Sequence, residues 1–460
     1  MAAMLIRRAE LWQGGIADLR IAGGKVSAIG TLEPKPGETV IEASGGALLP
    51  GLHDHHIHLS ASAVRKESIV CGPPQVRTPD ALRDALAKAP GDSWLRGILY
   101  HESVMGLPDA ARLDDLCRDR PLRIQHRSGR MWLFNSLALD TLLALGDPPQ
   151  GMEIENGRYT GRLFDEDPWL RSTLASLPPA FGAISAELAA FGVTGLTDMS
   201  PSNDTETASH FASEARSGRL VQRYCLAGTL KLGSGPVKLH LHEAALPDFD
   251  EVVDMIRNAH DQLRPIASHC TTETELVFTL AAIEAAGARR GDRIEHAGIA
   301  RDSHIAQIAE MQLAVVGQPH FIAERGDQYC ADVEPDLIPC LYRQAAFLRA
   351  GVTLAAGSDA PFGSADPWAA MRAAVTRQTA NGTVIGIDEE LSPEQALALF
   401  LADPVDLLVQ RSLTVGAPAD LCLLSAPWKL ARTALDASLV RATVIAGNLV
   451  HEAPVEGCTG

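Results

Sequence analysis

The chain has 460 residues, of which 46% are hydrophobic and 21% are charged. This composition is typical of a folded globular protein and excludes a largely disordered one. Its 40 basic and 57 acidic residues give a net charge of -17, which opposes binding to phosphate backbones and anionic lipid surfaces. We therefore expect a small-molecule substrate, with neither nucleic acid nor membrane as a partner.

The N-terminus gives no sign of export. Arg7, Arg8 and Glu10 interrupt the first residues before an apolar signal segment can form. No apolar run approaches the roughly 20 residues that a membrane span requires. The eight cysteines are scattered and form no CxxC pair, which favours reduced thiols in a cytosol. We expect a cytoplasmic protein.

The sequence pattern predicts short strands at both ends of the chain. Residues 4–49 contain β-rich pieces separated by Gly-Gly pairs, and residues 420–450 contain three more pieces with a Gly447-Asn448 turn. Neither end has enough strands for a stable sheet by itself. We predict that residues 1–48 and 412–460 pair into one small β-sandwich.

Between the ends, apolar strand candidates alternate with helical stretches, which predicts an α/β fold with a (β/α)8 TIM barrel over residues 49–411. Residues 62–190 are too long for one βα unit and predict an insertion after the first barrel strand. One strand candidate must be misplaced, either 122–125 or 221–227, since a barrel needs eight. The nine candidates are residues 47–52, 122–125, 193–197, 221–227, 237–241, 265–268, 293–295, 314–317 and 353–356.

Four histidines crowd into PGLHDHHIHL, directly after an apolar run. If the run continues as a strand, His56 and His58 project from the same face, because side chains alternate along a strand. Two imidazoles that converge on one point can hold a metal ion. A solvated histidine cluster would have the same composition, but the spacing further along the chain favours the metal site.

Four more polar residues occur at, or one position past, the ends of strand candidates: Lys238, His269, His296 and Asp359. They are separated by 31, 27 and 63 residues. Since a βα unit takes about thirty residues, these intervals correspond to one, one and two units. The residues would then end the fourth, fifth, sixth and eighth strands and meet His56 and His58 at the C-terminal face of the barrel.

Imidazole, carboxylate and amine groups in this number match zinc, with manganese, iron or cobalt as alternatives. Each residue also has an ordinary structural interpretation. A strand-end histidine is commonly a hydrogen-bonded core or surface residue, Asp359 after Gly357-Ser358 can cap a turn, and Lys238 can extend to water. Buried beside metal ions, the Lys238 amine can instead take up carbon dioxide and become a bridging, carboxylated lysine.

Three further histidines lie near the same predicted face. His320, in GQPHF after the seventh strand candidate, is a candidate second donor to the substrate oxygen or a substrate-orienting residue; a rim residue is the alternative. His240 and His242 share the strand face of Lys238 if the strand continues, which makes them candidate substrate contacts. A local polar role is the alternative for both.

The motifs in this order resemble the amidohydrolase superfamily. The HxH after PG, the strand-end histidines of SHC and RIEHA, and GSDAP carry the likeness. More narrowly, SWLRG, NSLAL, FGVTGLTDM, GQP and VGAPADLCLL resemble the family-3 amidohydrolases, which include YtcJ-like proteins and N-substituted formamide deformylases. The resemblance extends from about residue 48 to 425.

The resemblance implies a barrel with a discontinuous sandwich and one or two divalent metal ions. The implied ligands are His56, His58 and Asp359 for the first ion, His269 and His296 for the second, and carboxylated Lys238 as a bridge. Two departures fall where substrate contacts are expected. VKLHLHEAALPD lacks the acidic-glycine pair that usually follows the lysine, and Ser128-Gly129-Arg130 replaces the family's DGH. By the same resemblance, Arg130 and Trp132 are candidates to line the substrate pocket.

These features predict a metal-dependent hydrolase that cleaves a C–N bond in a small amide, formamide, carbamate or urea. A metal ion lowers the pKa of water to about 7, and Asp359 would take the proton and pass it to the leaving nitrogen. A cyclic-amide hydrolase or a deaminase on the same site is one alternative. An alternative of another class is a non-catalytic assembly protein that keeps the fold. We also expect a homo-oligomer.

Overall fold

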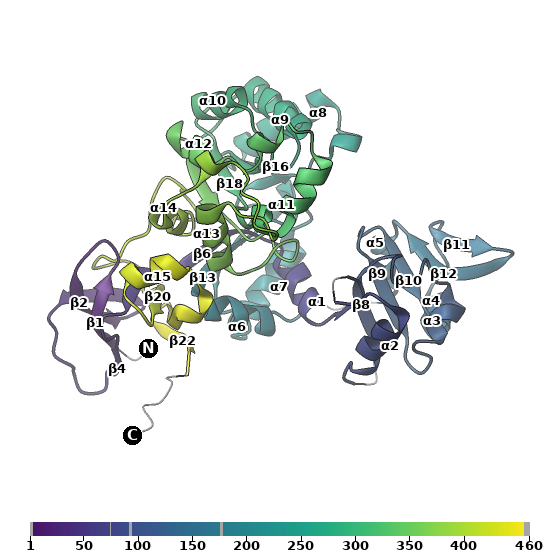
Figure 1. The fold of residues 1–460 in the computed structure, drawn as a ribbon, viewed down its shortest axis with the longest axis horizontal. Coiled ribbons are helices and arrows are strands. Elements are labelled where there is room, and N and C mark those ends of the chain that lie inside the picture. The colour runs from purple at the N-terminus through teal and green to yellow at the C-terminus, as the bar shows by residue number, and fades with distance from the viewer. Residues whose placement is uncertain (1–2, 74, 92–93, 175–177, 455–460) are drawn as a thin grey trace. The chain divides into compact units, whose positions relative to one another are not determined.

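The computed structural model describes residues 3–73, 75–91, 94–174 and 178–454. The chain forms two compact units (Figure 1). The first comprises Met1–Leu59 and Ala180–Gly460, and the second comprises Ser60–Pro179. The second unit is thus inserted into the sequence of the first. It ends at Pro179, earlier than the predicted end of the insertion at residue 190. Ser93 of the SWLRG motif and Cys458 lie outside the described residues.

Both ends of the chain contribute to one eight-stranded sheet in the first unit. β5 pairs with β1 on one side and with β20 on the other, and Ile6, Leu48 and Leu421 share one apolar core. A two-layer sandwich stays a prediction. The strands are β1 (Met4–Leu11), β2 (Ile16–Ala22), β3 (Lys25–Gly30), β4 (Thr39–Glu42), β5 (Ala47–Pro50), β20 (Leu421–Leu424), β21 (Val440–Ile445) and β22 (Asn448–Glu452).

The strand that carries His56 begins later than predicted. Residues 47–50 belong to β5 of the terminal sheet, and a separate strand, β6 (Leu52–Ile57), carries the histidines. Gly51 separates the two strands, and a Cβ there would lie 2.1 Å from Thr194 Cγ2, so only glycine permits this close approach. The prediction of a strand over residues 47–52 was therefore wrong, because one apolar run supplies two strands.

The rest of the first unit contains eight parallel strands, in two hydrogen-bonded sheets. One sheet has the order β14-β13-β6 and the other β15-β16-β17-β18-β19, and an isolated parallel bridge joins Gly228 to Val237 of β15. The pairing establishes a mixed α/β architecture and does not by itself close a barrel. Besides β6, the strands are β13 (Val193–Asp198), β14 (Arg223–Leu226), β15 (Val237–Leu239), β16 (Ile266–Cys270), β17 (Arg293–His296), β18 (Ala314–Gly317) and β19 (Thr353–Ala356).

Helices separate most of these strands and begin shortly after them. Thr272 starts α9 with a capping box, in which its hydroxyl accepts from Glu275 N and the Glu275 carboxylate accepts from Thr272 N. The helices are α6 (Gly182–Ala190), α7 (Thr205–Arg216), α8 (Phe249–Asp261), α9 (Glu273–Ala286), α10 (Asp302–Glu310), α11 (His320–Asp332), α12 (Gln344–Arg349), α13 (Pro367–Thr376), α14 (Pro393–Ala398) and α15 (Trp428–Ala434). Short 3-10 turns are η1 (Leu230–Leu232), η2 (Glu243–Ala245), η3 (Ile338–Cys340), η4 (Ile387–Glu389) and η5 (Ala437–Leu439).

The second unit has a six-stranded sheet in the order β11-β12-β10-β9-β8-β7. The strand predicted at residues 122–125 belongs here as β9, so it is the misplaced barrel candidate; a short apolar run does not reveal which sheet it joins. The strands are β7 (Ile69–Val70), β8 (Leu95–Tyr100), β9 (Leu122–His126), β10 (Met131–Phe134), β11 (Met152–Glu155) and β12 (Arg158–Phe164). The helices are α2 (Pro79–Ala87), α3 (Ala110–Asp114), α4 (Ser136–Leu145) and α5 (Asp167–Thr173), and α1 (Leu59–Lys66) precedes them.

Membrane-spanning helices are missing from the part of the chain that the structure describes: none is both long and apolar enough to cross a bilayer.

Candidate metal centre

β6 carries His56, and all six residues of this strand are buried; His58 follows the end of the strand by one residue and is half-buried. The Asp54 carboxylate accepts hydrogen bonds from Ser358 N at 2.9 Å and from Ser358 Oγ at 2.5 Å. Burial raises the pKa of Asp54 to about 6, although the Ser358 hydrogen bonds oppose the shift. Asp54 thereby holds the loop after β19 against β6.

That loop carries Asp359 into contact with both histidines of the motif. Asp359 Oδ1 lies 3.3 Å from His56 Nε2 and 3.1 Å from His58 Nε2. The Asp359 amide donates to His56 O at 2.6 Å, which fixes the loop to the strand. Burial alone would raise the pKa of Asp359, but its hydrogen bonds with His56 and His58 outweigh burial and hold the pKa well below the usual value.

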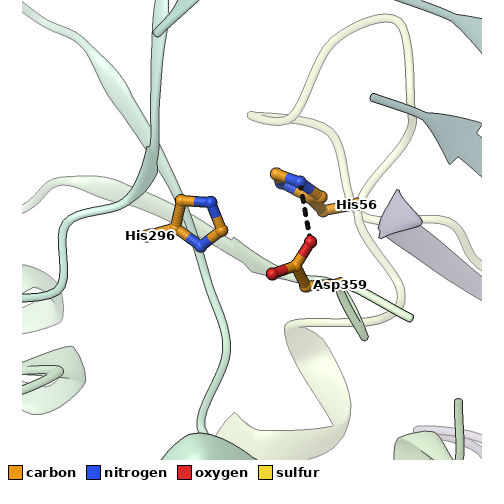
Figure 2. A group of neighbouring side chains, drawn as sticks. All are labelled: His56, His296 and Asp359. Carbon is orange, nitrogen blue, oxygen red and sulfur yellow. Dashed lines mark ion pairs between the residues drawn. The ribbon is translucent and has the colours of Figure 1, made fainter. Parts of the chain in front are cut away.

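His296, the last residue of β17, completes a group of three possible metal ligands. One ligand atom each from His56, His296 and Asp359 lies within 4.8 Å of the other two, and all three residues are buried. In Figure 2 the two imidazole rings and the carboxylate face a common space. His296 and Asp359 have positive φ angles of 69° and 51°. Such strained positions in non-glycine residues concentrate at functional sites.

The Nδ1 atoms of His56 and His296 are hydrogen-bonded, and this decides whether their Nε2 atoms can bind a metal ion. His56 Nδ1 donates to Glu295 Oε2 at 2.6 Å, and His296 Nδ1 donates to Gln318 Oε1 at 2.7 Å. In a neutral imidazole that donates through Nδ1, Nε2 carries a lone pair, so loss of the proton that His56 Nε2 shares with Asp359 would leave this nitrogen able to bind a metal. The donor set therefore fits a divalent transition metal such as zinc.

Glu295 belongs to a chain of charged groups. Its Oε1 lies 2.6 Å from Arg293 Nε, and it is fully buried. Burial would raise the pKa of Glu295, but Arg293 and His56 hold it far below the usual value. The anionic carboxylate strengthens the basicity of the His56 ring through the shared hydrogen bond.

Lys238, in β15, is 7% exposed. Among the described residues its Nζ has no hydrogen-bond partner. Burial lowers the pKa of this amine, although the Glu295 and Asp359 carboxylates oppose the shift. A buried amine without a partner is costly unless a further group completes its environment.

His269, at the end of β16, lies beside His296, with ring centroids 4.6 Å apart. His240 is 5.0 Å from His269 and 4.4 Å from His242, again between centroids. Burial first, and His242 next, lower the pKa of His240 to about 4. The structure thus gathers these imidazoles into a row, with His240 and His242 exposed at its outer end.

His320 begins α11 and is 1% exposed. Its Nε2 donates to the Ser358 carbonyl at 2.9 Å, so its Nδ1 is an acceptor. Within the described ranges Nδ1 has no partner. His320 therefore supports the loop that carries Asp359.

Arg130 and Trp132 belong to the second unit, away in the sequence from every residue of the metal centre. Arg130 is exposed and makes two hydrogen bonds of 2.7 Å to Asp165. Trp132 is 3% exposed, packs in the core of that unit and donates through Nε1 to Asp167 at 3.0 Å. Their predicted contact with substrate stays a prediction.

Sequence reasoning missed the residues that orient the ligands. Glu295 stands next to His296 in RIEH, Gln318 lies in GQP, and Ser200 Oγ is 3.1 Å from His58 Nδ1. Glu295 and Gln318 lie within motifs already noted for other reasons. Nothing in their spacing, however, indicates which imidazole they reach.

Comparisons with known proteins identify the family of the chain. The amidohydrolase family model matches residues 39–451. The chain is 24% identical to an N-substituted formamide deformylase from Arthrobacter pascens, over 84% of each chain, and 24% identical to the putative amidohydrolase YtcJ from Bacillus subtilis, over 90% of each. The crystal structure of an uncharacterised metal-dependent hydrolase from Pyrococcus furiosus has the same fold, with a TM-score of 0.74 at 21% identity over 92% of this chain and 99% of that one. The chain belongs to the amidohydrolase family and is a hydrolase.

Proposed function

We propose that this enzyme hydrolyses a C–N bond in a small amide, formamide, carbamate or urea. One observation carries the proposal. A buried carboxylate, Asp359, touches the Nε2 atoms of His56 and His58, and the far nitrogen of His56 is engaged by Glu295. This is the arrangement that a metal-assisted hydrolysis requires. The formamide deformylase relative supports a substrate with an acyl–nitrogen bond.

The residues fit one or two divalent ions, with zinc as the first candidate. His56, His58 and Asp359 would hold the first ion, and His269 and His296 the second. The close approach of His296 to His56 and Asp359 supports a compact centre. Carboxylated Lys238 would bridge the two ions. Its buried amine, which lacks a hydrogen-bond partner in the described part of the chain, supports this modification.

A bound ion supplies a Lewis acid that polarises the carbonyl and lowers the pKa of water. Asp359 provides the base. An aspartate carboxylate is ionised at neutral pH, so Asp359 would be able to accept the proton of the attacking water. It can then deliver that proton to the departing nitrogen. His320 maintains the position of this loop through Ser358, and Asp54 does so from the opposite strand.

We further infer that the eight parallel strands form a (β/α)8 barrel. Their chain order matches the order of pairing in both sheets, and the bridge between Gly228 and Val237 joins one pair of edges. At the other pair of edges, β6 and β19, the chain segments that follow the strands are also joined: Asp359 N donates to His56 O, and His58 N donates to Ala360 O. All the proposed ligands then lie at the C-terminal ends of strands, where barrel active sites occur.

We also propose a cytoplasmic homo-oligomer. Cysteines in the described part of the chain form no disulfides, which supports a reducing compartment. Light scattering on the purified protein would give the oligomeric state.

Two measurements on the purified protein test the hydrolase proposal. Elemental analysis should find at least one transition-metal ion per chain, and chelation should remove turnover that added zinc restores. A screen of formamides, carbamates and phenylureas should yield an amine together with the acid fragment. Ammonia release with an intact ring would instead show a deaminase, and full turnover after exhaustive chelation would contradict a metal-dependent mechanism. Asp359→Asn is the control that assigns turnover to this centre.

A further inference from the structure

A pocket of about 310 Å³ lies on the first unit and shares no lining residue with the metal centre. The end of β1 and the turn after it form one side, while α14 and α15 contribute the other. Leu11, Ala47 and Leu49 supply apolar lining. The volume is at the lower end of the range for small-molecule sites.

Two tryptophans form perpendicular walls. The rings of Trp12 and Trp428 have centroids 5.3 Å apart and an angle of 84° between their planes. Both side chains are only partly buried. Trp428 is fixed by its own hydrogen bonds, because its Nε1 donates to Glu394 Oε1 at 2.9 Å and its backbone N donates to Glu10 Oε2 at 2.6 Å. The corner is therefore held in place before a ligand arrives.

The charge of the pocket is negative. Glu10 and Glu394 are among its lining residues, and no basic residue is. Arg432 makes two hydrogen bonds to Glu394, at 2.7 and 2.9 Å, and these lower the pKa of Glu394 to about 2. Glu394 is thus already neutralised by a cation. Across the described residues Glu10 makes no ion pair, so one carboxylate charge remains uncompensated.

We propose that this pocket binds a small organic ammonium ion of the trimethylammonium class. The faces of tryptophan rings attract cations, and more strongly when water is excluded. The apolar lining favours alkyl groups over a hydrated metal ion, and the Glu10 carboxylate favours a cation over a neutral molecule of the same shape. These three features together select a cation with an apolar shell.

Isothermal titration of the purified enzyme with choline tests the proposal, with 3,3-dimethylbutan-1-ol as the neutral molecule of equal shape. We expect saturable binding of choline and at least about tenfold weaker binding of the alcohol, because only choline gains both the cation–π contact with the tryptophans and the attraction of the Glu10 carboxylate, and one tenfold step is about 1.4 kcal/mol. Glu10→Gln should weaken choline binding without changing the aromatic walls. Trp12→Leu should abolish it, and Trp12→Phe should retain part of it.

Trp169→Leu is the matched control, because Trp169 is a partly buried tryptophan of the second unit. Its variant should bind choline like the unmodified enzyme. Circular dichroism confirms that each variant is folded, and Glu10→Gln provides the answer if Trp12→Leu does not fold. Equal binding of choline and the alcohol would overturn the proposal in favour of a purely apolar pocket. Absence of saturable binding, or unchanged binding in both Glu10→Gln and Trp12→Leu, would overturn it as well.

Discussion

Two histidine clusters of this protein have similar side chains, but the Nδ1 atoms of their histidines play opposite roles in hydrogen bonding. In the metal centre, the Nδ1 atoms of His56 and His296 donate to side-chain oxygens. In the second unit, His101 and His126 flank Glu102, and the Nδ1 atom of each accepts from the backbone N–H of Ser103 or Ser128, at 3.2 and 3.1 Å. A backbone amide can only donate, so these two rings carry their proton on Nε2.

The difference lies in which nitrogen is left for a ligand. His126 Nε2 donates to Glu102 Oε2 at 2.9 Å, and His101 Nε2 lies 3.6 Å from the same oxygen. We call His101, Glu102 and His126 the Glu102 cluster. Its histidines accept through Nδ1 and donate through Nε2, whereas His56 and His296 donate through Nδ1, which leaves Nε2 as the nitrogen that a metal ion would bind. We therefore expect that histidines and a carboxylate at strand ends do not suffice for a metal site, because the hydrogen-bond partner of Nδ1 sets which nitrogen remains for a metal ion.

Removing one carboxylate from each cluster gives the largest contrast. Asp359→Asn should lower kcat by about 10²- to 10⁴-fold, because the amide cannot accept the proton of water. Much of the fold and some bound metal should remain. Glu102→Gln should leave kcat and metal content unchanged. Unimpaired turnover of Asp359→Asn would remove this residue as the base.

Lys238→Ala should remove the bridged second ion and most of the turnover. Metal content per chain, measured by elemental analysis, should fall relative to the unmodified enzyme, and added formate or acetate should restore part of the activity by taking the place of the carbamate. Full activity without such rescue would indicate a mononuclear centre.

The role of the hydrogen bond from His296 Nδ1 can be tested by changing its acceptor, Gln318. Gln318→Met removes the acceptor for His296 Nδ1–H and should weaken metal affinity by about 10- to 100-fold. Chelator competition measures this without reference to turnover. Gln344→Met is the matched control: Gln344 is a buried glutamine whose side chain has no hydrogen-bond partner among the residues described. Equal affinities of the two variants would contradict the proposed orienting role.

The smallest effect concerns the Glu102 cluster. The hydrogen bond from His126 is the main cause that lowers the pKa of Glu102 from 4.5 to about 2. The ionised carboxylate therefore stabilises the fold above about pH 4.5, and this contribution is lost as the pH falls towards about 2. The effect should be modest because Glu102 is exposed. Acid unfolding followed by circular dichroism should be slightly less steep in Glu102→Gln, and identical curves would contradict it.

The sequence predicted the family and the strands on which three of the candidate ligands lie. The roughly thirty-residue period of βα units placed Lys238, His269 and His296 on successive strands, and the structure has them on β15, β16 and β17. The resemblance to the family-3 amidohydrolases is confirmed. This period can be recognised in the sequence because it depends only on the number of residues in each βα unit.

Features that depend on tertiary contacts were not predictable in this way. Residues 122–125 form a strand as expected, but whether they join the barrel candidates or another sheet depends on partners elsewhere. The apolar run over residues 47–52 hid a change of sheet at Gly51, which depends on the closeness of Thr194. The hydrogen bond from His296 to Gln318 joins residues of β17 and the loop after β18, so no local pattern indicates it.

The pairing of β5 has a consequence for how the enzyme is made. β5 lies between β1 and β20, and only Gly51 separates it from the strand that carries His56. Residues 421–424 are synthesised long after residue 57, by roughly tens of seconds at the usual rate of translation. During that interval β5 has an open edge. If His56 and His58 are metal ligands as proposed, their assembly is tied to completion of nearly the whole polypeptide, and truncated chains should be poor at retaining metal.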